Sequence, residues 1–449
     1  MFYRFLKITI GTAVRIFFRK IVVVGDENIY SGNPVILVSN HPSAFMDPLV
    51  LGILLKKPLY FFARADIFKP GFVNWITKKA HLSPIYRIVD GAELLEKNDA
   101  VFSSAYQLLF EKKTLLLFGE GFTDEVFIRR VKPMKKGSMR IALGAENKFD
   151  FKLNVDIVCA GINYADPSKF RSDLLIKFSK PIPVNKYKDS FIEHNNKAML
   201  ELNKEIYSHL RDEVIHVDNS EYAELFEQLL ILSRKGINHE YYDRGISLRE
   251  RWKFSKQFAN SFNNMESENP HGIKILSEKC KEYFDGLKNL HVDDMEMSNI
   301  KRWSFQPIFE KVIYLVFLFP VFIFGMMNNY LPVKLSDILS KRISKRPVFW
   351  SSTNMVFSMV TVPIYYSLVV FILLKLNNHF HMLNLHLLFI FVYLAIMPLS
   401  GIFAFSYLKQ FHSLIEKIKF LRLDTPKKCE VEKLSILRKS ILEKMEELI

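Results

Sequence analysis

The chain has 449 residues, of which 49% are hydrophobic and 14% aromatic, and its formal net charge is +15. An apolar content that includes 40 phenylalanines is unusual for a soluble protein of this length and indicates membrane contact. Surplus cations suit an anionic surface, either nucleic acid or the cytoplasmic face of a bilayer. The cysteines show neither metal-ligand spacing nor a disulfide framework, which indicates reduced thiols facing the cytosol (Cys159, Cys280 and Cys429).

Residues 1–24 lack the uninterrupted apolar core and the cleavage site of a signal peptide. Apolar side chains alternate there with cations at Arg4, Lys7, Arg15, Arg19 and Lys20. This pattern predicts an amphipathic helix that lies on the membrane surface, and an ordinary packed helix is the alternative.

Residues 25–215 predict an α/β domain. Short apolar runs predict strands at 35–39, 59–63, 114–118, 156–162 and 174–178. Helices are expected between them, at 43–55, 71–80 and 100–113. The alternation predicts a mixed, mostly parallel sheet flanked by helices. Residues 216–303 are polar and helical in pattern, with a break at 269–272, and we interpret them as a linker or insertion.

The apolar residues concentrate in a membrane region at 304–410. Segments 349–374 and 386–408 are long enough to cross a hydrocarbon core of about 30 Å, whereas segment 312–327 is marginal and contains Pro320. Basic residues follow the first and the third segment, and short basic loops stay cytoplasmic. We therefore expect segment 312–327 to enter and return near Pro320 and the other two to form a spanning hairpin, although a full span of 312–327 stays open. Residues 411–449 predict a cytoplasmic amphipathic helical tail.

The decapeptide SNHPSAFMDP holds the first candidate for chemistry. His41 follows strand 35–39 at its carboxyl end, where open α/β sheets bind ligands, and Asp47 falls in the opening turns of the next helix. Side chains six residues apart do not share a helix face, so the two meet only because His41 precedes the helix. If they meet, a neutral imidazole takes a proton from an attacking hydroxyl and the carboxylate fixes its tautomer. A polar strand end without chemistry is the alternative.

Two further clusters follow strand 114–118. Glu120 is a candidate ligand for an acceptor hydroxyl, and Gly121 lets the backbone approach a ligand closely; a tight turn is the alternative. Basic residues then follow, and Arg and Lys both suit phosphate. A solvated or membrane-facing surface is the alternative for them. The candidate phosphate ligands are Arg87, Arg129, Arg130, Lys132, Lys135 and Lys136.

These clusters, in this order, resemble the phospholipid/glycerol acyltransferase family over roughly residues 20–190. The segment NHPSAFMDP resembles the family's first block, which implies His41 as general base, Asp47 as its orienting partner and Asn40 as a substrate-binding candidate. PIYRIVDG resembles the second block, whose arginine binds the acceptor's phosphate, here Arg87. FGEGFT resembles the third block and implies acceptor binding by Glu120 and Gly121, and VDIVCAGINY stands where the apolar fourth block is expected.

Two departures from the family pattern concern the acceptor. The spacer between His41 and Asp47 has five residues where four are usual, as in a branch similar to glycerol-3-phosphate and dihydroxyacetone-phosphate acyltransferases, which carry C-terminal membrane segments. In the third block Gly119 replaces proline and Phe122-Thr123 replaces Thr-Arg, so Arg129, Arg130 or Lys132 would take over the phosphate contact.

The resemblance implies transfer of a fatty acyl group from a coenzyme A or acyl-carrier-protein thioester to a hydroxyl of glycerol-3-phosphate or lysophosphatidate. It implies no metal and no cofactor beyond the acyl thioester. The expected partners are a phospholipid membrane and a phosphorylated glycerol acceptor, with the catalytic domain on the cytoplasmic side of the inner membrane. Another lipid acceptor such as an aminolipid, or non-catalytic lipid binding, is the alternative. Nucleic acid is not expected, because the basic residues lie beside apolar segments rather than on a recognition helix.

Overall fold

The computed structural model describes residues 2–65, 68, 71–86, 97–239, 242–298, 305–380, 387–421 and 425–447. The chain divides into two compact units. The first consists of Met1–Ala223, Lys235–Asn263 and Arg346–Ser352, and the second of Glu224–Arg234, Asn264–Lys345 and Thr353–Ile449.

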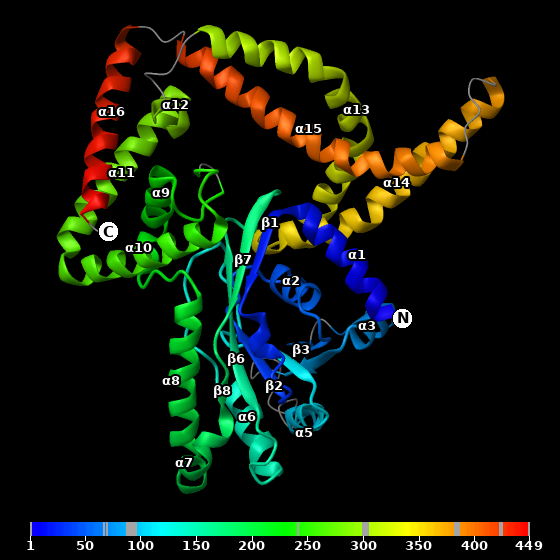
Figure 1. Cartoon of the computed structure of the whole chain (residues 1–449), viewed down its shortest axis with the longest axis vertical. Coiled ribbons are helices and arrows are strands. Elements are labelled where there is room, and N and C mark those ends of the chain that lie inside the picture. The colour runs from blue at the N-terminus through cyan, green and yellow to red at the C-terminus, as the bar shows by residue number, and fades with distance from the viewer. Residues whose placement is uncertain are drawn as a thin grey trace. The chain divides into compact units, whose positions relative to one another are not determined.

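A sheet of eight described strands organises the first unit (Figure 1). The strands are β1 Phe18–Val24, β2 Val35–Ser39, β3 Leu59–Arg64, β4 Leu82–Ile85, β5 Thr114–Phe118, β6 Asp156–Tyr164, β7 Ser172–Phe178 and β8 Ile182–Pro183. Their order is β1-β7-β6-β2-β5-β3-β4, with β8 beside β6. Strands β1, β2, β3, β4 and β5 make parallel pairs, whereas β6 pairs with β7 and β8 in antiparallel fashion. The fold class is therefore the expected mixed, mostly parallel sheet flanked by helices.

The helices of the first unit follow the expected pattern with one correction. The helix expected over residues 1–24 ends at Phe17, and 18–24 form β1, which pairs with β7. The Ile-Val-Val-Val run of β1 is β-branched, which favours a strand over a helix. The helices are α1 Phe2–Phe17, α2 Met46–Leu54, α3 Phe72–Lys79, α5 Lys97–Phe110, α6 Gly137–Lys148, α7 Lys188–Glu193 and α8 Asn195–Glu213.

Strand β2 lies in the middle of the sheet, and all its side chains are buried. A continuous apolar run suits this position because helices cover both faces of a parallel sheet. Ile36 and Val38 belong to a core that also includes Leu109 of α5, Ile141 of α6 and Ile206 of α8, so these helices cover one face. Helices α1 and α2 lie on the opposite side of the sheet from α8 (Figure 1).

The segment interpreted as a linker at 216–303 is not a single element. Its residues Lys235–Asn263 belong to the first unit, where Nη2 of Arg251 lies 2.5 Å from Oδ2 of Asp173 on β7. Arg251 comes from α10, Leu248–Glu268, and is buried. The remaining part contributes α9 Ala223–Ser233, α11 Pro270–Leu290 and α12 Asp294–Ser298.

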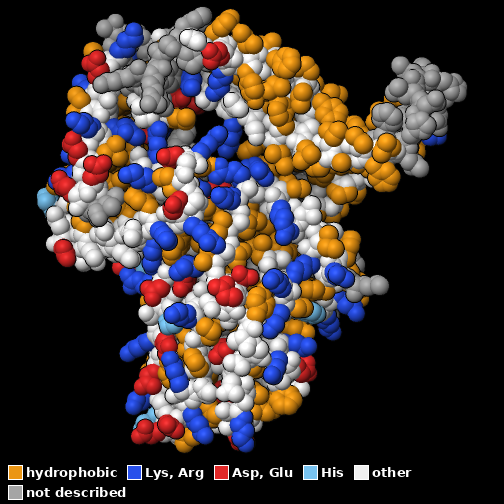
Figure 2. Space-filling view, in the orientation of Figure 1, with side chains coloured by type: hydrophobic (Ala, Val, Ile, Leu, Met, Phe, Trp, Pro, Cys, Tyr) orange, Lys and Arg blue, Asp and Glu red, His pale blue; other side chains and the backbone are white. Residues whose placement is uncertain are grey.

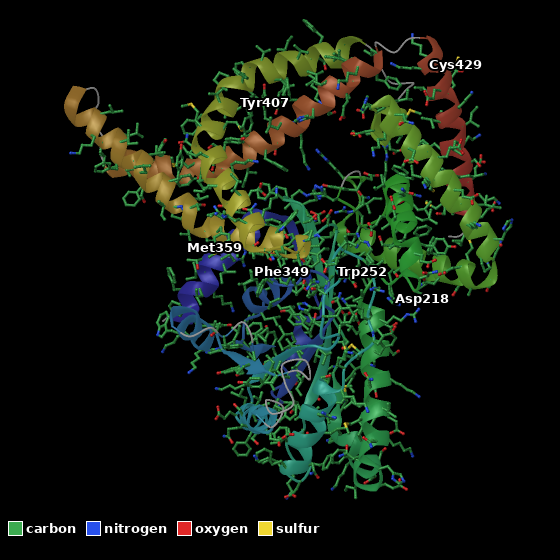
Figure 3. The ribbon with its side chains drawn as sticks, turned by 180° about the vertical axis from the view of Figure 1, so that it is seen from behind. Asp218, Trp252, Phe349, Met359, Tyr407 and Cys429 are labelled. Carbon is green, nitrogen blue, oxygen red and sulfur yellow. The ribbon has the colours of Figure 1, made fainter. Side chains whose placement is uncertain are left out.

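Long apolar helices dominate the second unit: α13 Phe305–Ile343, α14 Trp350–Phe380 and α15 Leu387–Leu421, followed by α16 Thr425–Glu446. Stretches Ile308–Ile343, Pro347–Leu376 and Ile390–Leu421 are long and apolar enough to cross a membrane. On the face shown in Figure 2, hydrophobic side chains cover much of α13 and α14. Tyr407 joins α15 to α13, because its hydroxyl donates to the carbonyl of Leu315 at 2.9 Å and its ring stacks on Phe322 (Figure 3).

The expected return of the chain at Pro320 is wrong. Pro320 and Pro332 both lie inside α13, which continues as one helix over 39 residues and curves along its length (Figure 1). Proline removes one backbone donor and bends a helix, but the neighbouring turns keep their hydrogen bonds. Gly325 lets α15 approach closely, because a Cβ there would lie 2.3 Å from the carbonyl oxygen of Ser400.

Candidate active site

The candidate site is built at the carboxyl ends of two adjacent parallel strands. Ser39, the last residue of β2, pairs in register with Phe118, the last residue of β5. The segments that follow these strands therefore leave the sheet at the same edge, which is where such sheets bind ligands. His41 follows β2 and Glu120 follows β5.

His41 and Asp47 are in contact. Nδ1 of His41 lies 2.8 Å from Oδ2 of Asp47, which sits in the first turn of α2 and is fully buried. The loop between them reverses the chain, and Ala44 adopts a left-handed conformation with φ of 43°. Such a backbone is uncommon outside glycine and persists where the surrounding contacts hold it. The turn at Ala44 thus brings His41 and Asp47 into contact, which their separation of six residues alone does not guarantee.

Three groups donate to the carboxylate of Asp47. Besides His41, the backbone N–H of Ser43 donates to Oδ2 at 2.8 Å, and the hydroxyl of Tyr164 donates to Oδ1 at 2.9 Å. Burial, together with the nearby carboxylate, raises the pKa of Tyr164 well above its ordinary value, so the phenol keeps its proton. An acceptor with three donors suits the ionised carboxylate, which holds the proton of His41 on Nδ1. Nε2 then carries the free lone pair.

The imidazole of His41 is fixed from a second direction. Its ring stacks on Phe118, with centroids 4.1 Å apart and an interplanar angle of 16°. The side chain remains 19% exposed, so a ligand has access to it. Among the residues that the structure describes, none forms a hydrogen bond to Nε2 of His41. The arrangement therefore presents an oriented, accessible base.

Glu120 braces the loop that carries His41. Oε2 accepts a hydrogen bond from the backbone N–H of His41, and Oε1 accepts one from the backbone N–H of Lys132, both at 3.1 Å. The ammonium of Lys132 lies 3.0 Å from Oε2. Burial raises the pKa of Glu120, and Lys132 opposes this effect. Acceptor binding by Glu120 stays a prediction, but both of its carboxylate oxygens already have protein partners.

Asn40 has a similar bracing position. Its side-chain amide donates to the carbonyl of Ile162 at 3.0 Å, and its side-chain oxygen accepts from the N–H of Ile162 at 2.8 Å. Asn40 is buried. These two bonds join the end of β2 to β6 and leave the predicted substrate contact of Asn40 without support from the geometry.

Glycines shape the turn around Glu120. Gly121 has φ of 75°, a conformation that favours glycine. A Cβ at Gly119 would lie 2.1 Å from Cε of Met134, so a side chain there would displace this methionine. The N–H of Lys135 donates to the carbonyl of Gly119 at 2.7 Å. The turn is thus packed against the start of the basic run.

The basic residues divide into paired and unpaired ones. Arg130 pairs with Asp124 at 2.6 Å, and buried Lys132 lies between Glu120 and Asp124. Lys135 and Lys136 are exposed and make no ion pair among the described residues. Lys135 and Lys136 are therefore the described cations of this run whose charge is most available to a phosphate. Arg87, the other predicted phosphate ligand, lies outside the described residues.

Arg129 has a structural role that its sequence context does not reveal. Its guanidinium donates to the backbone carbonyls of Tyr164, Ala165 and Ile237. The side chain is buried. Arg129 therefore ties the basic run to the end of β6 and is not available as a phosphate ligand in this arrangement.

A second histidine holds the same run. Nδ1 of His216 accepts from the N–H of Val131 at 2.8 Å, and Nε2 lies 2.9 Å from Oδ1 of Asp218, which is labelled in Figure 3. Burial lowers the pKa of His216 to about 4, so the ring is neutral near pH 7. Sequence reasoning missed both His216 and Tyr164. The His-x-Asp pattern at 216–218 was a signal that could have indicated His216.

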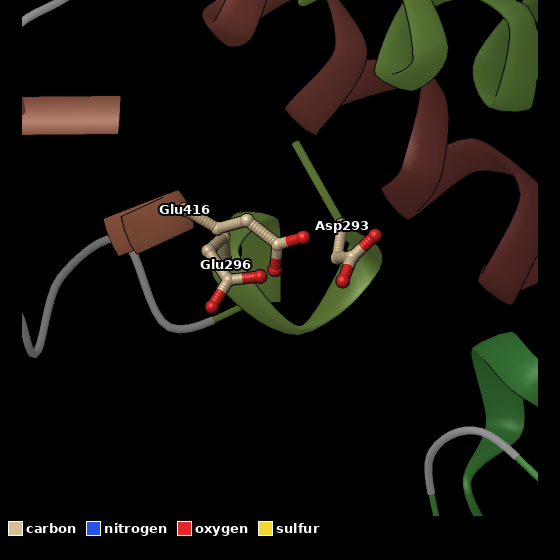
Figure 4. Close-up of side chains that lie close together, drawn as sticks. All are labelled: Asp293, Glu296 and Glu416. Atoms are coloured by element: carbon tan, nitrogen blue, oxygen red, sulfur yellow. The ribbon is translucent and has the colours of Figure 1, made fainter. Parts of the chain in front are cut away.

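Another group of carboxylates lies in the second unit. The ligand oxygens of Asp293, Glu296 and Glu416 are within 4.8 Å of one another (Figure 4). Burial, together with Asp293, raises the pKa of Glu296 to about 7. A shared proton relieves the repulsion between such carboxylates as a cation would. The group therefore does not by itself indicate a metal.

Comparison with known proteins matches this domain to one family. Residues 20–162 match the family model described as Acyltransferase, and this range contains His41, Asp47, Arg87 and Glu120. The 1-acyl-sn-glycerol-3-phosphate acyltransferase of Borreliella burgdorferi is 30% identical over 129 residues, which are 28% of this chain and 46% of that protein. The chain thus spans less than half the length of this relative. The structure of the 1-acyl-sn-glycerophosphate acyltransferase PlsC from Thermotoga maritima is 20% identical, with a TM-score of 0.30, and the match covers 44% of this chain and 79% of that one.

Proposed function

We propose that this chain is a member of the phospholipid acyltransferase family and transfers a fatty acyl group from a thioester to a lipid-precursor hydroxyl. The match of residues 20–162 to the Acyltransferase family model supports this proposal. The donor is a coenzyme A or acyl-carrier-protein thioester, and the acceptor is glycerol-3-phosphate or lysophosphatidate. The observation that carries the proposal is the contact between His41 and Asp47, which leaves Nε2 free beside the strand ends.

The proposed reaction uses His41 as general base. Nε2 removes the proton of the acceptor hydroxyl while the oxygen of that hydroxyl attacks the thioester carbonyl carbon. The tetrahedral intermediate collapses with cleavage of the carbon–sulfur bond, and the imidazolium returns the proton to the leaving thiolate. Asp47 stabilises the imidazolium and keeps Nδ1 protonated, with Ser43 and Tyr164 holding the carboxylate in place.

The acceptor's phosphate is proposed to bind at the exposed end of the basic run. Lys135 and Lys136 lack acidic partners among the described residues, which leaves their charge available for an anion. Arg87 is a further proposed ligand from the family pattern. Arg130 and Lys132 would contribute after a change of partner, because both are paired with carboxylates.

The proposed setting is the cytoplasmic face of the inner membrane. The three long apolar helices support membrane association. The acyl substrates and products suit this setting because their chains partition into lipid.

A panel of donors and acceptors tests the proposal. The purified full chain is assayed with acyl-coenzyme A or acyl-carrier protein against glycerol-3-phosphate, lysophosphatidate and an aminolipid. We expect turnover with one of the phosphorylated acceptors, and the double substitution Lys135→Gln/Lys136→Gln should raise its KM at least about tenfold, since hydrogen bonds to charged groups contribute about 1.5–3 kcal/mol each. The exposed pair Lys152→Gln/Lys180→Gln is the control. Turnover restricted to the aminolipid would reject the phosphorylated acceptor.

A further inference from the structure

A basic groove lies at the end of α2 away from the catalytic pair. It has a volume of about 640 Å³, and its walls are one face of α1 and the segment that follows α2. Asp47 lies in the first turn of α2, whereas the groove begins at Ile53, six residues or about 9 Å further along the helix. The groove is therefore separate from the site proposed for acyl transfer.

Four cations line this groove: Arg4, Lys7, Arg15 and Lys56. No carboxylate is among its lining residues, and residues 1–25 contain neither Asp nor Glu. None of the four cations makes an ion pair within the described part of the chain. Four like charges around one hollow repel one another unless an anion joins them.

Lys7 has a role in forming the groove. Its ammonium donates to the carbonyls of Leu55 and Lys56, which follow the last turn of α2. Burial lowers the pKa of Lys7. The contact fixes α1 against the end of α2, so the other three cations face a hollow that is already formed. Arg4 and Arg15 are exposed.

Apolar side chains adjoin these cations on α1. Phe5 is 60% exposed and Ile8 is 65% exposed, and both lie within one helical turn of Arg4 or Lys7. Exposed apolar residues beside basic ones are typical of helices at the surface of an anionic bilayer. A free phosphate has no apolar part that could contact Phe5 and Ile8, whereas a phospholipid has both an anionic headgroup and acyl chains.

We propose that this groove binds the headgroup of an anionic phospholipid of the surrounding membrane. The phosphate lies among Arg4, Arg15 and Lys56, and the acyl chains lie against the exposed apolar side chains of α1. Such a lipid would fix α1, and through Lys7 the end of α2, at the membrane surface. This role lies beyond acyl transfer, because the bound lipid is neither donor nor acceptor.

The test measures lipid binding to the full chain in neutral detergent by calorimetric titration. The probes are dihexanoyl-phosphatidylglycerol, dihexanoyl-phosphatidylcholine, glycerol-3-phosphate and inorganic phosphate. We expect saturable binding of the phosphatidylglycerol but not of the phosphatidylcholine. This binding should persist in excess inorganic phosphate or glycerol-3-phosphate, because any glycerol-3-phosphate bound at the acceptor site lies outside the groove. The triple substitution Arg4→Gln/Arg15→Gln/Lys56→Gln should weaken it roughly 100-fold, because each cation near an anionic lipid contributes about fivefold. Lys7 is kept because of its contact with α2.

A charge-matched control separates the groove from the general charge of the protein. Lys20→Gln/Lys152→Gln/Lys180→Gln removes the same charge at exposed positions outside the groove and should change the affinity less than about threefold. If the triple variant fails to fold, Arg4→Gln alone should weaken binding about fivefold. Equal affinity of wild type and groove variants, equal binding of phosphatidylcholine, or full competition by inorganic phosphate or glycerol-3-phosphate would each overturn the proposal.

Discussion

Nδ1 of His41 and Oδ2 of Asp47 lie 2.8 Å apart, although a helical path between the two residues would point their side chains in different directions. The contact exists because the chain turns at Ala44 before α2 begins. Six residues are then enough for the first turn of the helix to face back toward the end of β2. The same loop is held by Glu120 through the N–H of His41.

Replacement of Asp47 by asparagine should abolish most of the activity without unfolding the domain. An amide donates to Nδ1 and moves the ring proton to Nε2, which removes the base. We expect kcat for acyl transfer to fall by about 10³-fold or more, as for other histidines that lose an orienting carboxylate. The assay is initial rate with a labelled acyl donor. Asp150→Asn, at an exposed site, should retain full activity, and an Asp47→Asn rate within about tenfold of wild type would contradict the assigned role.

The hydroxyl of Tyr164 should affect activity through Asp47. Tyr164→Phe leaves one buried carboxylate oxygen without its donor, which costs about 1–3 kcal/mol. We expect a roughly five- to tenfold lower kcat with unchanged KM, in addition to the loss of stability. Tyr187→Phe provides the control, because the Tyr187 hydroxyl also bonds a carboxylate, that of Glu205, away from the site. An equal effect of both substitutions on kcat would show that Tyr164 acts through stability alone.

Acidification should weaken the segment held by His216. Its folded pKa of about 4 lies below the ordinary value of 6.5, so the unfolded chain binds more protons between these pH values. The stability from neutral His216 is full above pH 6.5 and is lost as the pH falls to about 4, by about 3 kcal/mol. The free energy of unfolding of the first unit should depend less on pH in His216→Gln. Exposed His194→Gln should behave as wild type; the opposite pattern would refute this assignment.

Glu296 should have the opposite pH dependence in the second unit. Its folded pKa of about 7 exceeds the ordinary value of 4.5, so the folded state binds the extra proton. The stability it provides is full below pH 4.5 and is lost as the pH rises through about 7, by roughly 3 kcal/mol at most. The midpoint of thermal unfolding in detergent, compared at about pH 5.5 and about pH 8, measures this loss of stability. Glu296→Gln should reduce the difference between the two midpoints, whereas an unchanged difference would assign it to other groups.

The sequence correctly predicted those elements whose local pattern of apolar and polar residues determines their structure. Strands 35–39 and 114–118 are continuous apolar runs bounded by polar residues, and both form as expected. Strand β1 was missed because Arg19 and Lys20 continue the cationic pattern of α1. The β-branched run at 21–24 favours a strand, and pairing with β7 adds to that preference. Pro320 predicted a turn that the packing of α13 against α15 overrides.

The candidate site shows the same division between local and long-range information. His41, Asp47 and Glu120 stand in short motifs and were predicted as candidates from them. Tyr164 was missed because its contact with Asp47 spans 117 residues of sequence. Lys132 resembles the exposed lysines near it in the sequence. In the fold, however, its side chain is buried and its ammonium pairs with the carboxylates of Glu120 and Asp124.

The rate of acyl transfer by His41→Ala decides whether this histidine is the base. The full chain is assayed with labelled acyl thioester and the acceptor that the wild type uses, beside His194→Ala, which removes an exposed histidine. We predict that His41→Ala loses at least about 10³-fold in rate while it folds and associates with membranes as the wild type does. A His41→Ala rate within about tenfold of wild type would contradict general-base catalysis by this residue.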